Sequence, residues 1–212
     1  MDHQRDGLDL SMSALFQVFF GAHASAAASY DLVEENVEGT GTPSGWIDSG
    51  SPNWDYTSVV LQGSQSLKCS SGQSTYKTFT GSTTVHAYSL FRIPSSIPGS
   101  TTTYHAIRDS AGTALATFRV NSSGQMIVFA NGSESTPTVD ALSANTTYHV
   151  WCLFTSGGTC SVAFSTDGTK PTSGNAYTFK TGGSGTAARL QLNPVAIYDR
   201  ILASTTAIGN SP

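Results

Sequence analysis

Charged residues are scarce in this chain of 212 residues, where they make up 11% of the sequence and give a formal net charge of −4 at pH 7. The ten lysines and arginines are scattered, and no basic run occurs. Nucleic-acid binding needs a clustered positive patch that neutralises phosphates, so we expect no nucleic-acid partner. The apolar run at residues 14–20 is far too short to cross a bilayer, so we expect no membrane span.

Cysteine is also scarce, and the three residues Cys69, Cys152 and Cys160 cannot all pair within the chain. Cys152 and Cys160 flank an apparent hairpin turn at 156–158. If Phe154 lies opposite Cys160, the two sulfur atoms are offset by two residues, and a disulfide would need distortion. We therefore expect buried free thiols, with a distorted bridge as the alternative. No CxxC or HExxH spacing is present, so the sequence predicts no metal site and no cofactor.

Hydroxyl side chains are abundant instead, with 31 serines and 27 threonines beside 21 glycines. Such a composition is typical of extracellular and virion-surface β proteins. After Ala28, short runs rich in Val, Thr, Tyr and Phe alternate with Gly, Ser, Asn and Pro clusters, and no helical period is sustained. The pattern predicts a single all-β domain, an antiparallel two-sheet sandwich over 29–212. The expected strands are 30–36, 56–62, 65–70, 74–80, 83–93, 102–108, 113–120, 125–130, 146–155, 159–166, 176–180 and 187–201.

The first 28 residues differ from the rest and have two interpretations. The leading stretch is acidic and its apolar run is short, which fits a secretory signal peptide poorly. We expect residues 1–28 to form an arm that buries its apolar side chains against other subunits, because exposed apolar patches mark contacts. The expected assembly contacts are Leu15, Phe16, Val18, Phe19 and Phe20. The alternative is a signal peptide that is removed on secretion.

Two later stretches resemble a known family. The hairpin "TTYHVWCLFTSGGTCSVAFSTDG" and the closing "LNPVAIYDRIL", together with an early strand "YDLVEENVEGTGTPSGW", resemble the concanavalin A-like lectin/glucanase superfamily, specifically its laminin G-like jelly rolls. This resemblance implies a jelly-roll sandwich, and lectin-like domains of this kind occur on phage particles. The matching positions are Tyr148, His149, Val150, Asp167, Gly168, Val195, Ile197, Tyr198, Asp199, Arg200 and Leu202. The family's closing strand has an acidic pair where this chain has Asn193 and Pro194, which weakens a cation site there.

Catalytic signatures of that superfamily are not found. Its glucanases place carboxylates at alternating positions of one strand, so that both reach one glycosidic bond. Here Glu34 and Glu35 are adjacent, and Glu134 stands alone in a loop. The Gln-x-His strand of alginate lyases is also missing. We therefore predict that the protein is not an enzyme.

One aromatic loop is a candidate glycan site, because sugar rings stack on exposed aromatic rings while amides and carboxylates bind hydroxyls. The loop "SGWIDSGSPNWDYT" offers Trp46, Asp48, Asn53, Trp54, Asp55 and Tyr56. The alternative is that both tryptophans cover the end of the core.

Two hypotheses about function follow. The first is a non-catalytic virion or surface component, such as a capsid-decoration or tail-associated protein, located on the virion surface. Its N-terminal arm would contact other assembly subunits, within a homo-oligomer or larger assembly, and its sandwich would bind surface glycans. The second is a secreted, extracellular carbohydrate-binding module or a degenerate polysaccharide-active enzyme.

Overall fold

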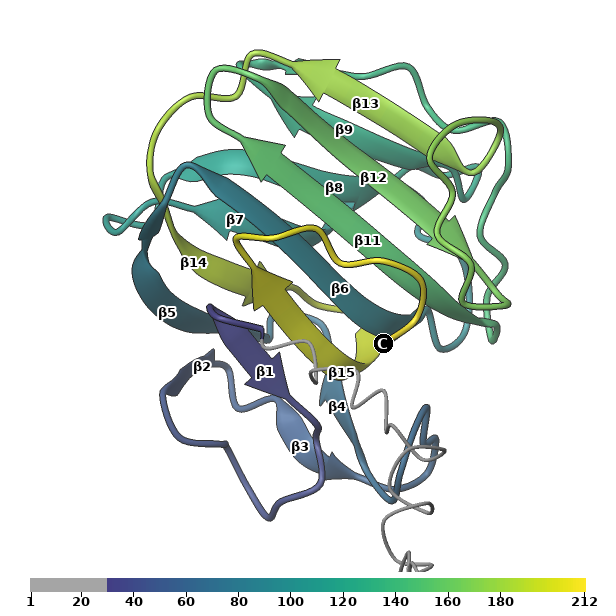
Figure 1. Ribbon diagram of the computed structural model, residues 1–212. Coiled ribbons are helices and arrows are strands. Elements are labelled where there is room, and N and C mark those ends of the chain that lie inside the picture. The colour runs from purple at the N-terminus through teal and green to yellow at the C-terminus, as the bar shows by residue number, and fades with distance from the viewer. Residues whose placement is uncertain (1–29) are drawn as a thin grey trace, which may run out of the picture.

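The computed structural model describes residues 30–212, which form two antiparallel sheets packed face to face (Figure 1). One sheet has the order β13-β12-β11-β6-β15-β4-β3, with β1 pairing β15, and we call it the β6 sheet. The other has the order β10-β9-β8-β7-β14-β5-β2, and we call it the β7 sheet. The strands are β1 Val33–Glu35, β2 Trp46–Ser49, β3 Asn53–Tyr56, β4 Ser66–Cys69, β5 Ser74–Ser82, β6 Thr84–Arg92, β7 Thr102–Arg108, β8 Ala114–Val120, β9 Met126–Ala130, β10 Ser133–Glu134, β11 Thr147–Thr155, β12 Thr159–Ser165, β13 Tyr177–Thr181, β14 Ala187–Leu192 and β15 Ala196–Ser204.

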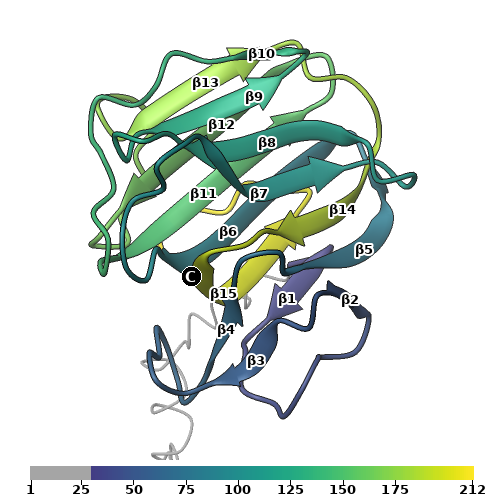
Figure 2. The same ribbon diagram turned by 180° about the vertical axis from the view of Figure 1, so that it is seen from behind.

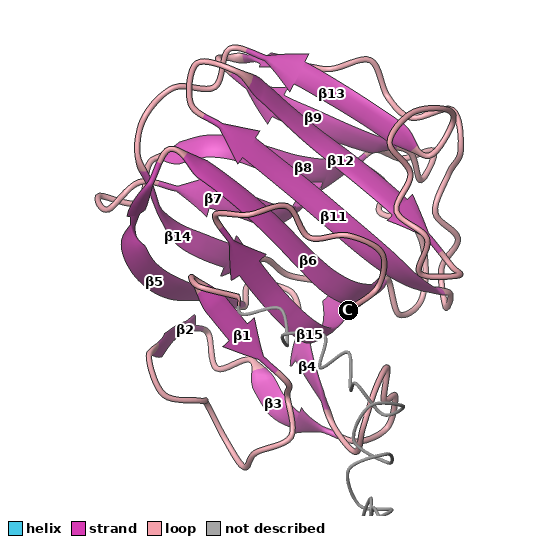
Figure 3. Ribbon diagram, in the orientation of Figure 1, coloured by secondary structure: helices cyan, strands magenta, loops and turns pink. Residues whose placement is uncertain are grey.

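The all-β sandwich expected from the sequence is confirmed: the described residues contain strands and loops and no helix (Figure 3). It follows that no helix long and apolar enough to cross a membrane occurs between residues 30 and 212. The core lies between the sheets, because every second side chain of each strand points inward. Its largest fully buried side chains include Phe91, Tyr104, Phe118, Phe154 and Tyr198.

The hairpin of β11 and β12 has the expected register. Cys152 lies opposite Val162 and Val150 opposite Phe164. The three cysteines are buried and free, as predicted. Burial raises the pKa of the Cys69 thiol to about 12, so this thiol stays protonated and acts as a small apolar side chain.

The predicted strand 187–201 is wrong as a single strand. The chain changes sheets within it: β14 belongs to the β7 sheet, and β15 belongs to the β6 sheet. Asn193 donates its backbone N–H to the carbonyl of Tyr104 (2.9 Å), and Val195 adopts a left-handed backbone with φ of 65°. Pro194 stands at this crossing, where its lack of an N–H costs no ladder hydrogen bond.

The predicted strand 56–62 is also wrong, because pairing stops at Tyr56 and the segment up to residue 65 is a loop. Two carboxylates hold this loop. Asp199 accepts the N–H of Gln62 at 3.0 Å, and Glu38 accepts the N–H of Ser64 at 3.0 Å. The short strands β2, β3 and β10 were not predicted, since two to four residues carry too little alternation to be recognised.

The outer face of the β6 sheet is covered by the chain's own C-terminal segment, 205–212 (Figure 1). Ile208 packs there in a second apolar cluster with Tyr88, Trp151, Ala163 and Leu202. The Trp151 indole donates its Nε1–H to the carbonyl of Gly209 at 2.9 Å. We call this surface the covered face. It is a second, smaller core and leaves Trp151 only 2% exposed.

Candidate functional site

Figure 2 shows the β7 sheet from its outer side. The outward positions of its strands hold polar and aromatic side chains that the core does not use. Leu190 and Leu192 of β14 and Phe118 of β8 point into the core, so their strand neighbours point outward. Strand pairing places the outward positions of β5, β14, β7, β8 and β9 side by side. We call this surface the open face and define it by Tyr76, Ala106, Arg108, Thr117, Arg119, Phe129, Arg189 and Gln191.

Arg108 and Arg189 lie directly opposite each other on the neighbouring strands β7 and β14. Both bind the turn that joins β7 to β8. Arg108 donates from Nη1 to the carbonyl of Gly112 at 2.6 Å, and Arg189 donates from Nη2 to the carbonyl of Ser110. Gly112 has a φ of 93°, and a Cβ atom there would lie 3.1 Å from Arg189 Nη1. The left-handed backbone therefore favours glycine, and a larger side chain there would press on the Arg189 guanidinium.

Asp109 closes the same turn and does not neutralise the arginine pair. Its carboxylate accepts the N–H of Thr113 at 2.7 Å. Backbone hydrogen bonding, chiefly from Thr113, lowers the pKa of Asp109. Within residues 30–212, no salt bridge joins a carboxylate to Arg108 or Arg189.

Two arginines stack on aromatic rings of the open face. The guanidinium carbon of Arg189 lies 5.0 Å from the ring centroid of Tyr76. That of Arg119 lies 4.0 Å from the ring centroid of Phe129. Arg119 also forms an ion pair with Glu134 at 3.1 Å. Stacking of this kind holds the planar guanidinium in one orientation and leaves its edge available to a ligand.

The floor of the open face is made of short side chains. Ala106 and Thr117 lie opposite each other on β7 and β8, and both are buried beneath their longer neighbours. Gln191, opposite Ala106 on β14, donates its amide to Asn193 Oδ1 at 2.7 Å. The site is thus a shallow surface with fixed cations and aromatic rings around short residues, which suits a flat, hydroxylated ligand.

The aromatic loop predicted as a glycan site lies elsewhere, at β2 and β3. Trp46 and Trp54 are 6% and 2% exposed, and their rings pack edge to face at 5.1 Å. Each indole N–H is satisfied by a carboxylate: Trp46 donates to Glu35 at 3.2 Å, and Trp54 donates to Asp48 at 3.2 Å. The two rings therefore offer no face to a sugar, and the alternative, that they cover the core, agrees with their burial.

The remaining members of that loop also have structural contacts. Asp55 is exposed and accepts the N–H of Gly41 at 2.7 Å, while Asn53 caps the N–H of Asp55 at 2.9 Å. Lys68 lies over the Tyr56 ring at 4.6 Å. The expected assembly contacts, Leu15, Phe16, Val18, Phe19 and Phe20, lie outside the described residues.

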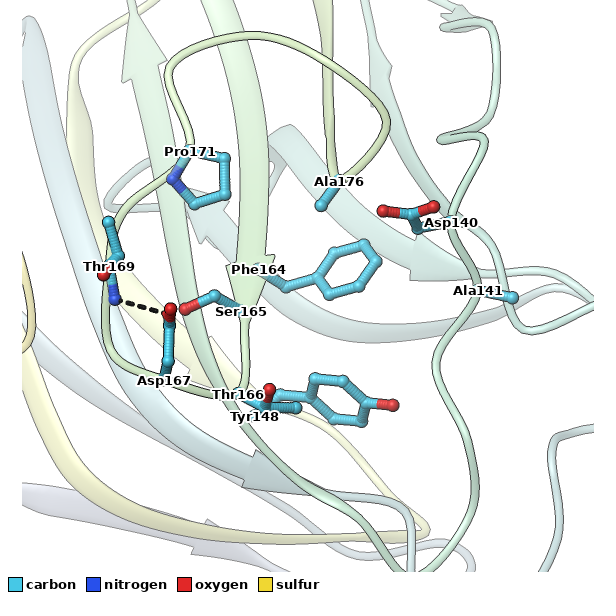
Figure 4. A pocket seen from close by; sticks show the side chains of 10 residues that line it. All are labelled: Asp140, Ala141, Tyr148, Phe164, Ser165, Thr166, Asp167, Thr169, Pro171 and Ala176. Atoms are coloured by element: carbon cyan, nitrogen blue, oxygen red, sulfur yellow. Dashed lines mark hydrogen bonds between the residues drawn. The ribbon is translucent and has the colours of Figure 1, made fainter.

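A cleft of about 570 Å³ lies at one end of the sandwich, beside the start of β11 and the end of β12 (Figure 4). Asp140 and Asp167 approach it from opposite walls, with Tyr148 and Phe164 between them. The N–H of Thr169 binds Asp167 at 2.9 Å and lowers the pKa of this carboxyl, which therefore stays ionised at neutral pH. Both rings are largely buried. The cleft is acidic and fits a cationic or neutral ligand better than an anion.

Asp199, in the closing motif, is a buried carboxyl that organises the loop 57–65. Burial raises its pKa to about 6, although it accepts hydrogen bonds from Ser66 Oγ (3.0 Å) and the Arg200 N–H (2.7 Å). It lines a pocket of about 280 Å³ together with Glu38. Among residues 30–212 no cluster of three or more His, Cys, Asp or Glu side chains could hold a metal ion.

His105 is the one histidine of β7, and it lies in the core beneath the open face. Its Nε2 atom lies 2.9 Å from Ser89 Oγ of β6, so this hydrogen bond joins the two sheets. Complete burial lowers the pKa of His105 to about 3. Both side chains are inaccessible, so a serine nucleophile activated by this histidine would not meet a substrate.

No known protein-family model matches the chain. No curated protein is similar to it in sequence. Solved structures share its fold: a protein named sialidase has a TM-score of 0.58 at 10% identity, over 84% of this chain and 19% of that chain. Trypanosoma rangeli sialidase in complex with sialic acid has a TM-score of 0.52 at 11% identity, over 85% of this chain and 32% of that one. Trypanosoma rangeli sialidase in complex with the inhibitor DANA has a TM-score of 0.51 at 13% identity, over 70% of this chain and 26% of that chain.

These similarities correct one prediction. The chain spans about a fifth to a third of the length of those solved structures. Proteins named sialidases, which are glycoside hydrolases, contain this fold, so the prediction that the protein is not an enzyme is wrong. Missing carboxylate motifs of one superfamily do not exclude the chemistry of another. At 10–13% identity the similarity shows the fold alone.

Proposed function

We propose that the protein is a carbohydrate-binding sandwich and that the open face of the β7 sheet is its binding surface. The observation that carries the proposal is the combination on one exposed sheet face of aromatic rings with fixed hydrogen-bond donors. Sugars need both, since their C–H faces pack on rings while their hydroxyls and carboxylates take directed hydrogen bonds.

The solved structures support the proposal. One of the sialidases with this fold is in complex with sialic acid, so the fold occurs in a protein that binds a sugar. A sandwich fold serves many functions, so the fold alone does not identify a ligand. The proposal therefore rests on the side chains of the open face. The covered face offers less surface to a glycan, since its central tryptophan is buried.

A glycan array probed with the full chain tests this function. Tyr76→Ala removes an open-face ring and is expected to abolish or strongly reduce binding to the glycans that the wild type retains. Phe179→Ala is the matched control, because Phe179 is an aromatic side chain of β13 in the other sheet and is 55% exposed. Retention of no glycan by the wild type would remove the proposal, and loss only in Phe179→Ala would move the site to β13.

We also propose a more specific role for the protein, as a component of a virion or another surface assembly. A laminin G-like jelly roll displayed on a virion or other surface assembly would use residues 1–28 to contact its neighbours, and the apolar side chains at 15–20 support this. Deleting residues 1–28 is then expected to abolish incorporation into the particle while leaving a folded sandwich. Unchanged incorporation would favour the secreted alternative.

A further inference from the structure

We infer that the ligand of the open face is an acidic oligosaccharide of the polyuronide type, whose carboxylates are bound by Arg108 and Arg189. The inference rests on the proposed function and deepens it by naming the class of ligand. It is carried by the charge of this face, by the paired geometry of the two arginines and by the position of a third arginine, Arg119.

The charge of the open face is opposite in sign to that of the whole chain. Three arginines lie on it, and Glu134 is the carboxylate that pairs with one of them, Arg119. Counting the three arginines against Glu134 and Asp109, the carboxylate of the β7–β8 turn, gives the face a net charge of +1, whereas the chain carries −4. A cationic surface on an acidic protein selects anionic ligands and speeds their approach.

The arginine pair is costly to the fold. Like charges directly opposite each other on neighbouring strands are destabilising, and Arg108 lies opposite Arg189. The Nε atoms of both are buried and have no hydrogen-bond partner among the described residues. The hydrogen bonds that both arginines donate to the β7–β8 turn hold this pair in place, but no carboxylate within residues 30–212 forms a salt bridge with either. A bound carboxylate would compensate the charge that the protein leaves uncompensated.

The geometry favours a carboxylate over a hydroxyl. Turn carbonyls hold one N–H of each guanidinium, and the Tyr76 ring supports the Arg189 plane at 5.0 Å. Both guanidinium groups are therefore held in place, and their remaining terminal Nη–H groups can donate to the oxygens of a carboxylate.

The distance between Arg119 and the arginine pair indicates how long the ligand is. Arg108 lies opposite Ala114 of β8, and Arg119 lies five positions further along that strand. At about 3.3 Å per residue, Arg119 is roughly 16 Å from the arginine pair. A single acidic sugar cannot reach both positions, whereas an oligomer with a carboxylate on each unit can. The acidic cleft between Asp140 and Asp167 would repel such a ligand.

Calorimetric titration of the full chain with hexagalacturonate and with its methyl ester tests this inference, because the two probes share a backbone and differ in carboxylate charge. We expect the acid to bind at least about tenfold more tightly than the ester. Arg108→Gln and Arg189→Gln are each expected to lose about tenfold in affinity for the acid. Arg92→Gln is the matched control, since Arg92 makes the same charge change on β6, in the other sheet.

Each of the other possible results contradicts either the inference or the proposed function. Equal binding of acid and ester overturns the inference and leaves the proposed function intact, while binding of neither probe, together with an empty glycan array, removes both. An equal loss in Arg92→Gln would show that the general charge of the chain, and not this face, attracts the ligand.

Two further probes test what the face recognises. Dextran sulfate that binds as tightly as the acid would show a charge effect without carboxylate recognition. Equal affinity for sialyllactose, which carries one carboxylate, would overturn the requirement for several. Thermal unfolding of each variant confirms that it is folded.

Discussion

The covered face and the open face are the outer surfaces of the same sandwich, and they differ in what lies on them. On the β6 sheet, the C-terminal segment packs Ile208 onto Tyr88, Trp151 and Leu202 and turns the surface into a second core. On the β7 sheet, arginines and aromatic rings occupy the corresponding outward positions. The comparison shows that aromatic content alone does not identify a binding surface. An aromatic side chain contributes to stability or to recognition according to what covers it.

The largest effect that separates the two faces is expected for their aromatic side chains. Trp151→Ala should lower the free energy of unfolding by about 3–5 kcal/mol, because it empties a closed cluster and removes the hydrogen bond to Gly209. Tyr76→Ala on the open face should cost about 1 kcal/mol or less, since the ring is part-exposed. Urea unfolding measures both. Equal losses would mean that the open face is also part of the stabilising core.

The C-terminal segment itself should contribute a smaller amount. Ile208→Ala is expected to lower the free energy of unfolding by about 2 kcal/mol, near the low end for such a change, because a terminal segment can relax into the space. Ile47→Ala is the control, as Ile47 is 47% exposed on β2 and should cost little. Hydrogen exchange of the Trp151 indole N–H should speed up in Ile208→Ala alone. An unchanged exchange rate would contradict the covering role of the segment.

The stability of the core beneath the open face should depend on pH through His105, whereas ligand binding should not depend on this residue. His105 has a folded-state pKa of about 3, so it stays neutral in the folded protein, whereas in the unfolded chain it is protonated below about pH 6.5. The unfolded state then binds more protons, and the stability that neutral His105 allows is lost as the pH falls from 6.5 towards 3.

The matching experiment compares wild type with His105→Gln, whose amide can still bond to Ser89. Between about pH 6 and pH 4, the unfolding free energy of the wild type should fall relative to the variant by up to about 1.4 kcal/mol per pH unit. Saccharide binding at pH 7 should be the same in both proteins, since His105 lies in the core. Parallel pH profiles would show that His105 is not the group that titrates.

The sequence predicted the sandwich and the register of the β11–β12 hairpin because strict alternation fixes which side chains face the core. It did not predict the change of sheet at Asn193–Val195, since a strand that leaves one sheet and enters another keeps a continuous apolar pattern. For Trp46 and Trp54, residue types that suit a sugar site also suit a core, and nothing local separates the two.

The open face was missed for a related reason. The sequence places Arg108 at the end of a predicted strand and indicates no role for Arg119 or Arg189. The three arginines come together only through the pairing of β7 with β8 and β14. A local signal did exist. Arg108 follows the buried Ile107, Arg119 lies between Phe118 and Val120, and Arg189 precedes Leu190. An arginine at an outward position of several core strands indicates a polar sheet face.

The smallest expected effect is a change in local environment, and it tests the central claim most directly. Amide chemical shifts of the isotope-labelled full chain are recorded by NMR during titration with hexagalacturonate. If the open face is the binding surface, the perturbed amides should cluster on β5, β14, β7 and β8. The largest chemical-shift changes should occur in the β7–β8 turn at 109–113. Perturbations confined to the loop 46–56, or to the cleft between Asp140 and Asp167, would contradict this assignment.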